Sequence, residues 1–144
     1  MDRTFRSDCA MASTLDILGD KWSLLVIRNL MLGARSFRQI QSAPEGIATN
    51  ILSERLKRLV EAGLIVEQRA DAGSGARGRY ALTPAGADLL PVLQAIAIWG
   101  RDNIPNRRPI PPEFLTITPA ELLARDQPLM TDTTSPTSDQ PKAR

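Results

Sequence analysis

The sequence contains no histidine and only one cysteine, Cys9, among its 144 residues. A lone cysteine excludes an intrachain disulfide and a cysteine-cluster metal site, and without histidine a zinc finger lacks its nitrogen ligands. The commonest general base of enzymes is missing as well, and the acidic residues form no spaced carboxylate pair. There is no glycine-rich phosphate loop. We therefore expect no catalytic residues, no metal and no other cofactor.

Long apolar runs and aromatic residues are also scarce. No run approaches the roughly 18 apolar residues of a membrane span. The N-terminal segment MDRTFRSDC lacks the apolar stretch of a signal peptide. We expect a cytoplasmic protein that does not enter a membrane. Aromatic residues make up 4% of the chain and apolar residues 42%, so the core should be aliphatic.

The charge balance has little excess of either sign. A net charge of +2 is weak evidence for a nucleic-acid partner, because many other proteins share it. The distribution is more informative, since eight basic and five acidic residues lie between Arg35 and Tyr80. The basic residues are Arg35, Arg38, Arg55, Lys57, Arg58, Arg69, Arg77 and Arg79. They coincide with the most regular pattern of the chain.

That pattern is IATNILSERLKRLVEAGLIVEQR, residues 47 to 69. Leu52, Leu56 and Leu59 recur at helical spacing, which predicts an amphipathic helix with one buried face. Gly63 is suited to end that helix in a left-handed conformation, with Leu64 as its apolar partner. The segment LIVEQR then alternates like a strand, DAGSGARG is typical of a loop, and RYAL predicts a returning strand.

Three helices are predicted before this segment. The first carries Met11, Leu15 and Leu18 and should end at Gly19, after which Asp20 is placed to cap the second. The second, WSLLVIRNLML, is apolar on nearly all sides and should be the centre of the domain. Ser36 and Gln39 form the pattern of a capping box for a short third helix that reaches about residue 43.

The turn Pro44, Glu45 and Gly46 separates the short third helix from the amphipathic one. This is helix-turn-helix spacing, although two amphipathic helices joined by a glycine turn also occur in many all-helical proteins. A β-hairpin directly after the pair favours a winged helix. We therefore predict a mainly helical α+β fold with a small hairpin, a winged helix-turn-helix that dimerises through its terminal helices.

The residues after the hairpin predict a long apolar helix. Thr83 should cap it, Pro84 suits its first position, and Pro91 within it predicts a kink. Its apolar stripe is too wide for an ordinary surface helix, and is either a dimer seam or a cover of the core. The candidate seam residues are Leu89, Leu90, Leu93, Ile96, Ala97 and Trp99.

Four blocks together resemble the HxlR-type winged-helix transcriptional regulators over about residues 9 to 101. They are LDILGDKWSLLVIRNLMLGARSF, GIATNILSERLKRLVEAGLI, RYALTPAG and LLPVLQAIAIWG, in the family's order and spacing. The resemblance implies a homodimer that binds a two-fold related operator in double-stranded DNA. It also implies that terminal helices pair the two subunits and that a small or electrophilic metabolite changes the occupancy of the operator.

Two positions depart from the family pattern. Where the family has a serine cap and often a lysine or arginine, this chain has Ala48 and Asn50, so we expect the cap at Thr49 and a different operator. In the wing, the family's R-V-E-Y becomes R-G-R-Y, residues 77–80, which replaces an acid with a base. This change should strengthen attraction to the DNA backbone rather than sequence readout.

Side-chain chemistry assigns a role to each candidate DNA-binding residue. Asn pairs with adenine, and Glu accepts from cytosine, whereas Lys and Arg meet phosphates or a narrow minor groove. The candidates are Ser36, Arg38, Thr49, Asn50, Ser53, Glu54, Lys57, Arg77 and Arg79. Each also has an ordinary structural explanation: surface cations are solvated, Ser36 is a cap, and Glu54 pairs with Arg58.

Cys9 is a candidate redox or electrophile sensor, because a thiol near a helix N-terminus can gain reactivity and many members of the resembled family have cysteine there. Against sensing, Asp8 disfavours a thiolate, Ala10 replaces the family's proline, and no second cysteine can resolve a sulfenic acid.

The predicted domain organisation has three parts. Residues 1–103 form the DNA-binding and dimerisation domain, 104–126 a proline-rich extension with a short helix, and 127–144 a disordered tail. The short helix should lie in TPAELLARD, either packed on the dimer or as a loose arm. An alternative function remains open, a winged-helix protein-interaction module without specific DNA binding.

Overall fold

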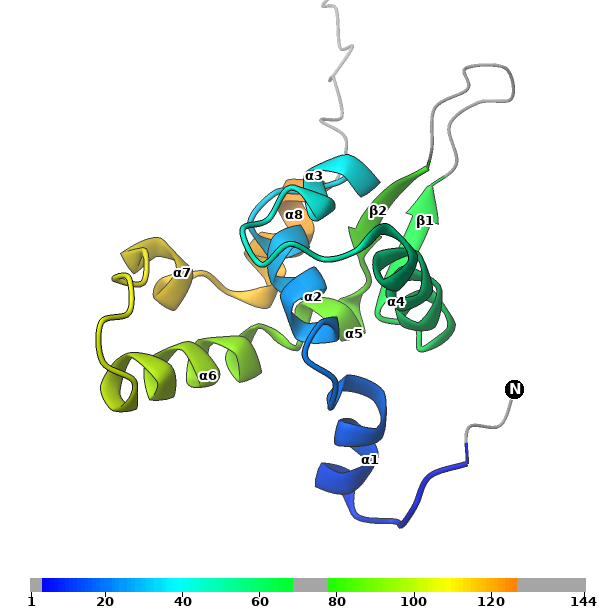
Figure 1. Ribbon diagram of the computed structural model, residues 1–144, viewed down its shortest axis with the longest axis horizontal. Coiled ribbons are helices and arrows are strands. Elements are labelled where there is room, and N and C mark those ends of the chain that lie inside the picture. The colour runs from blue at the N-terminus through cyan, green and yellow to red at the C-terminus, as the bar shows by residue number, and fades with distance from the viewer. Residues whose placement is uncertain (1–3, 69–77, 127–144) are drawn as a thin grey trace, which may run out of the picture.

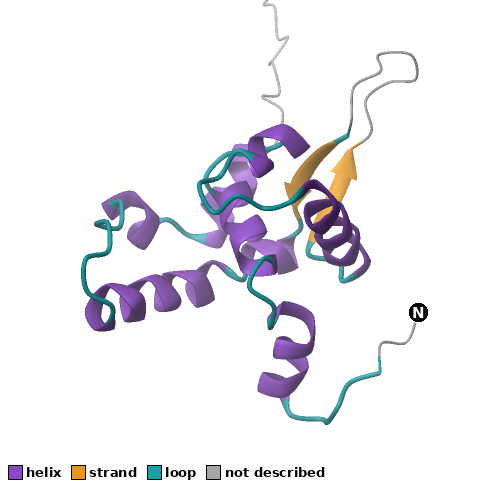
Figure 2. Cartoon of the chain, viewed as in Figure 1, coloured by secondary structure: helices purple, strands orange, loops and turns teal. Residues whose placement is uncertain are grey.

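The computed structural model describes residues 4–68 and 78–126, which form a mainly helical fold with one small sheet (Figure 1; Figure 2). The predicted winged helix-turn-helix is confirmed. No helix within these two ranges is both long and apolar enough to cross a bilayer. The elements in chain order are α1 (Ala10–Leu18), α2 (Ser23–Met31), α3 (Phe37–Gln41), α4 (Thr49–Glu61), β1 (Ile65–Gln68), β2 (Arg79–Leu82), α5 (Pro84–Ala87), α6 (Leu90–Asn103), α7 (Pro112–Thr116) and α8 (Pro119–Asp126).

Helix α2 lies at the centre of the fold, as its nearly continuous apolar sequence predicts (Figure 1). Val26, Ile27 and Leu30 are at most 2% exposed and belong to one aliphatic core cluster with residues of α3, α4 and β1. The predicted capping role of Asp20 is confirmed, because its carboxylate accepts hydrogen bonds from the backbone N–H of Trp22 and Ser23.

The hairpin follows α4 through the predicted glycine stop. Gly63 has φ +74°, and the N–H of Leu64 donates to the carbonyl of Leu59 at 3.0 Å, which closes the end of the helix. Strands β1 and β2 are antiparallel, with Ile65 opposite Leu82 and Gln68 opposite Arg79. Residues 69–77 lie outside the described residues, so the predicted wing loop and Arg77 do too.

The segment after the hairpin differs from the predicted single helix. Thr83 caps α5 as expected, its hydroxyl accepting from the N–H of Gly86, but the helix ends after one turn. Helix α6 then begins at Leu90 and places Pro91 in its first turn. The predicted kink is therefore wrong. Backbone N–H groups of the first turn have no partner within a helix, so the missing N–H of Pro91 removes no helical hydrogen bond.

The region after α6 is more ordered than a proline-rich extension. Residues 112–116 form α7, a helix that was not predicted within this segment, and Gln94 Nε2 donates to the carbonyls of Phe114 and Ile117 at 2.9 and 3.1 Å. The predicted helix α8 is confirmed. Its Leu122 is 4% exposed within the main core cluster, so α8 packs on its own domain rather than forming a loose arm. The predicted tail, 127–144, lies outside the described residues.

Candidate nucleic-acid interface

The N-terminus of α3 carries the predicted capping box. Ser36 Oγ accepts from the N–H of Gln39, and Gln39 Oε1 accepts from the N–H of Ser36, both at 3.1 Å. Ser36 Oγ therefore keeps its own hydrogen to donate to a ligand. Arg38, in the first turn, is exposed to solvent. The capping explanation of Ser36 is correct and leaves a donor at the helix end.

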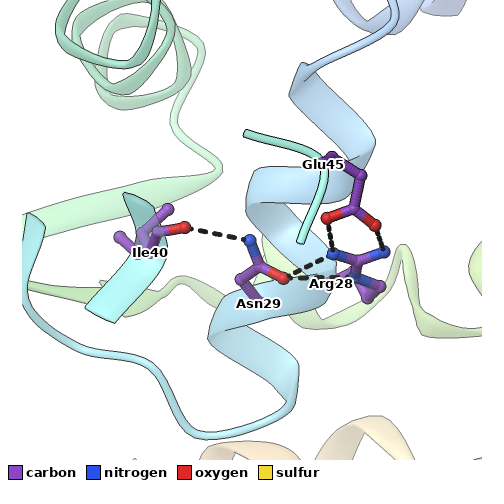
Figure 3. A network of polar contacts seen from close by, with 4 residues as sticks. All are labelled: Arg28, Asn29, Ile40 and Glu45. Atoms are coloured by element: carbon purple, nitrogen blue, oxygen red, sulfur yellow. Dashed lines mark hydrogen bonds and ion pairs between the residues drawn. The ribbon is translucent and has the colours of Figure 1, made fainter. Parts of the chain in front are cut away.

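The turn between α3 and α4 is fixed by side chains of α2 (Figure 3). Arg28 donates to both carboxylate oxygens of Glu45, at 2.6 and 2.9 Å, and also to Asn29 Oδ1. Asn29 Nδ2 in turn reaches the carbonyl of Ile40 at 3.4 Å. The hydrogen bonds from Arg28 lower the pKa of Glu45. This Arg28–Glu45 clasp sets the turn, which the sequence pattern alone did not reveal.

Helix α4 separates its two faces as the leucine period predicts. Leu52, Leu56 and Leu59 are at most 2% exposed. The opposite face presents four candidate DNA-contacting side chains to solvent, Asn50, Ser53, Glu54 and Lys57. A continuous polar edge on a helix whose other face is fixed in the core is the geometry that major-groove reading requires.

The start of α4 differs from the expected cap. Ala48 occupies the N-cap position without any side-chain hydrogen bond, and Thr49 is the first helical residue. The hydroxyl of Thr49 instead accepts from Gln41 Nε2 at 2.7 Å. Thr49 thus connects the two helices of the helix-turn-helix, because its position within the first turn directs its side chain toward the end of α3.

Arg55, one of the eight basic residues between Arg35 and Tyr80, has a structural role and is not exposed for contact with DNA. The Arg55 side chain is 14% exposed, and its Nε donates to Asp20 Oδ2 at 2.8 Å. Its Nη1 lies 3.2 Å from Glu54 Oε1 without hydrogen-bond geometry, so that buried nitrogen has no hydrogen-bond partner among the described residues. Glu54 therefore contacts Arg55, not Arg58 as expected. Helical spacing was the available signal, since Arg55 lies three residues after Leu52 on the buried side.

The carboxylate of Asp20 binds both Arg55 of α4 and the first residues of α2. Partial burial by itself would raise the pKa of Asp20. Hydrogen bonds from Ser23 Oγ, from Arg55 and from the N–H of Trp22 and Ser23 outweigh that effect and hold the pKa well below its usual value. The carboxylate therefore ties the start of α2 to the middle of α4.

The base of the wing is joined to the start of α3. Ser36 forms an isolated antiparallel bridge with Arg79, and the N–H of Tyr80 donates to the carbonyl of Arg35 at 2.7 Å. Arg79 itself is exposed. A Cβ at Gly78 would lie 2.7 Å from Glu67 Oε1 and 3.1 Å from the carbonyl oxygen of Gln68, so glycine leaves room there for the Glu67 side chain. The wing and the helix-turn-helix therefore share one backbone framework.

The candidate seam residues divide into two groups. Leu90 is fully buried, Leu93 is 7% exposed, and Leu89 packs against the core cluster. These three residues therefore cover the core, which was the alternative to a dimer seam. Ile96 and Trp99 are 49% and 63% exposed, and Ala97 is intermediate.

The candidate sensor Cys9 lies at the N-cap position of α1. It is exposed to solvent and is not bonded to another sulfur.

Residues 17–108 match the model of the HxlR-like helix-turn-helix family. The chain is 34% identical over 96 residues to an uncharacterised HTH-type transcriptional regulator of Mycobacterium tuberculosis, covering 67% of this chain and 60% of that protein. It is 35% identical over 89 residues to the HTH-type transcriptional regulator YodB of Bacillus subtilis, covering 62% of this chain and 79% of YodB.

Solved structures show the same architecture. The crystal structure of PA1607, described as a candidate transcription factor, has a TM-score of 0.65 at 38% identity and covers 73% of each chain. Reduced YodB of Bacillus subtilis has a TM-score of 0.57 at 27% identity and covers 71% of this chain and all of YodB. YodB structures also include a quinone-bound form and a diamide-treated form.

Proposed function

Since the chain belongs to the HxlR-like helix-turn-helix family of transcriptional regulators, we propose that it binds a two-fold related operator in double-stranded DNA as a homodimer and represses transcription there. The main support is the exposed polar edge of α4 above its buried leucines. Sequence readout needs such an edge held rigidly, and here the Arg28–Glu45 clasp and the Asp20–Arg55 pair hold both helices.

The exposed side chains suggest a division of roles along the interface. Asn50 reads an adenine and Glu54 accepts from a cytosine amino group, with Ser53 beside them. Lys57 neutralises a phosphate. Thr49, held by Gln41, positions the first turn of α4. Its hydroxyl thereby supports the reading edge without itself carrying the specificity.

The remaining contacts are to the DNA backbone and minor groove. Ser36 and Arg38 meet a phosphate beside α3, because one offers a hydroxyl hydrogen and the other an exposed guanidinium. Arg79 and the wing's Arg77 enter the adjacent minor groove. The Ser36 and Arg79 bridge supports this pairing of roles, since it keeps the two contact regions side by side.

Exposed apolar side chains on α1 and α6 support the homodimer. Met11 and Leu15 of α1 are 74% and 54% exposed, and on α6 Ile96 and Trp99 are similarly open. Helix α6 also packs on the core through Leu90 and Leu93, but these exposed faces of α1 and α6 are left uncovered within the described residues. A second subunit that covers them would place two α4 helices about a two-fold axis, as a two-fold related operator requires.

The decisive experiment is selection of genomic fragments by the purified protein, followed by anisotropy titration of the selected site. We expect log affinity to fall linearly with log salt, and affinity for the site to exceed that for bulk DNA by about 10³-fold or more. Binding without preference for any fragment would contradict the proposal. It would favour a protein-interaction module instead.

We further propose that Cys9 makes the protein responsive to oxidants or electrophiles. The support is its exposure at the N-cap of α1, two residues before Met11 of the face that we assign to the dimer. The related YodB has been crystallised with quinone and after diamide treatment. Diamide, quinone or methylglyoxal should therefore change operator affinity, and Cys9→Ser should abolish the change. Unaltered affinity after confirmed modification of Cys9 would rule this out.

A further inference from the structure

A groove of about 770 Å³ borders the helix-turn-helix. One wall consists of residues from α2, α3 and the turn after α3, among them Gln39 and Pro44. The other wall is the segment that follows α6, residues 106–108 and Pro111. Its volume falls within the range of roughly 300–1,000 Å³ that is typical of small-molecule sites. None of the DNA-contacting side chains assigned above lines this groove.

The groove has a positive charge that no neighbouring acid cancels. Three arginines line it, Arg28, Arg107 and Arg108, and the single acid among its described lining residues is Glu45. Glu45 is already bound by Arg28 through two hydrogen bonds, so those charges neutralise each other. Arg107 donates from Nε to the carbonyl of Pro105 at 3.1 Å, which orients its guanidinium. Arg107 and Arg108 therefore make the site attractive to an anion.

The backbone brings the two arginines there through an unusual conformation. Asn106 has φ +62°, a left-handed conformation that few residues other than glycine adopt but that asparagine tolerates. This single residue reverses the chain directly after α6. Asn106 and both consecutive arginines line the groove.

The groove also offers apolar surface beside the charge. Leu32 is 62% exposed and lines it, together with Ala34, Pro44 and Pro111. A DNA phosphate backbone has no apolar body that would cover such a leucine. We propose that this groove binds a small organic anion, whose carboxylate or phosphate pairs with Arg107 and Arg108 while its aromatic or aliphatic body packs on Leu32 and Pro111.

The site is connected to the helix-turn-helix through shared residues. Pro44 and Glu45 belong both to the groove wall and to the turn that orients α3 against α4. An anion held by Arg107 and Arg108 lies in the groove that Arg28 and Glu45 also line, so its charge repels Glu45 and alters the clasp that holds the turn. The consequence, a change of operator affinity on anion binding, rests on the proposed function, whereas binding itself does not.

The test is NMR titration of the full chain with sodium benzoate and with phenyl phosphate at constant ionic strength. We expect saturable shifts confined to groove amides such as Leu32, Ala43 and Asn106, with a dissociation constant of about 1 mM or tighter. The double variant Arg107→Ala/Arg108→Ala should weaken binding about tenfold or more. Its matched control is Arg101→Ala/Arg125→Ala, which removes two arginines that do not line the groove and should bind as the wild type does.

Several results would overturn the proposal. These are absent shifts up to about 10 mM, equal binding by both double variants, or equal shifts with uncharged benzyl alcohol. Loss of operator affinity by the groove variant without any probe binding would instead make the arginines phosphate contacts of DNA. If the chain selects no operator, the proposed function fails, while the NMR titration still decides the groove. Probe binding that leaves operator affinity unchanged would overturn the regulatory coupling alone.

Discussion

At the scale of single residues, the basic side chains between Arg35 and Tyr80 have different roles, structural in some cases and exposed to solvent in others. Arg55 and Lys57 are two positions apart on α4, yet Arg55 is 14% exposed and bound to Asp20 whereas Lys57 points to solvent. The helical period separates them, because a shift of two residues turns a side chain by roughly half the helix circumference. Counting charges along the sequence therefore overestimates the charge available to a nucleic acid.

The Asp20 carboxylate should stabilise the fold in a pH-dependent manner. Its pKa is lowered in the folded chain, so its contribution is complete above the unfolded value near 4 and is lost as pH falls through the folded pKa. Asp20→Asn should reduce the free energy of unfolding by about 2 kcal/mol at pH 7. The difference from wild type should shrink below about pH 4.

Urea denaturation followed by circular dichroism at fixed protein concentration measures this difference. The matched control is Asp102→Asn, since Asp102 forms an exposed pair with Arg101 and its loss should change stability little. Equal losses in the two variants would contradict the structural role of Asp20. So would a deficit that persists unchanged at pH 2.

The polar edge of α4 gives a second prediction at the residue scale. Lys57→Ala should weaken binding to all DNA sequences together and lower the magnitude of the salt slope by about one. Asn50→Ala should relax the preference at one base pair, costing about 1–3 kcal/mol on the selected operator only. Competition anisotropy with single-base operator variants distinguishes them. A uniform loss in both variants would invalidate the separate roles.

At the scale of elements, the short α5 shows how close packing determines where a helix can lie. A Cβ at Gly86 would be 2.0 Å from the backbone carbonyl oxygen of Leu64. Only glycine lets α5 approach the start of the hairpin this closely, and Thr83 reinforces the contact by donating to the carbonyl of Gly63. The connection after β2 is therefore fixed to the end of α4.

Gly86→Ala should destabilise the chain by about 1–3 kcal/mol, because backbone must move to accommodate the methyl group. Gly100→Ala is the matched control, since its Cβ meets open space within α6. There alanine should be neutral or stabilising by up to about 1 kcal/mol. Thermal unfolding of both variants decides the matter, and a similar loss of stability at both positions would refute the packing explanation.

The terminal elements show which patterns could and could not be predicted. Alternation and turn residues located both strands, and the T-P-x-E pattern located α8, whose cap joins Thr118 and Glu121. The break between α5 and α6 was missed, because Leu89 and Leu90 continue the apolar period across it. Helix α7 was missed because three prolines near its start favour an extended chain, although Pro112 suits a first helical position.

At the scale of the whole molecule, the chain has apolar surface that its own fold leaves uncovered. Met11 and Leu15 on α1 and Ile96, Ile98 and Trp99 on α6 contribute to it, and both helices extend away from the central helix α2 (Figure 1). The polar DNA-contacting edge lies on α4. A homodimer through α1 and α6 would bury the first surface and leave the second free.

Ile96→Glu combined with Trp99→Glu should convert the proposed dimer into a monomer, because buried charges without partners would oppose association. Sedimentation velocity should detect a halved mass, and operator affinity should fall by about 10²-fold or more, because one half-site contact is lost. Val66→Glu is a control on an exposed apolar residue of β1 and should leave the mass unchanged. A monomeric wild type would exclude the dimer.

The order of elements from α1 to β2, the buried leucines of α4 and the capping box of α3 were determined by the sequence alone, because period, turn residues and caps act over a few residues. The tertiary structure decided which charges are free, because Arg55 and Asp20 are 35 positions apart and Arg28 and Glu45 are 17 apart. It also assigned Leu90 to the core and Trp99 to the surface, and brought Arg107 and Arg108 to the turn. Such contacts depend on how elements pack, which no local pattern records.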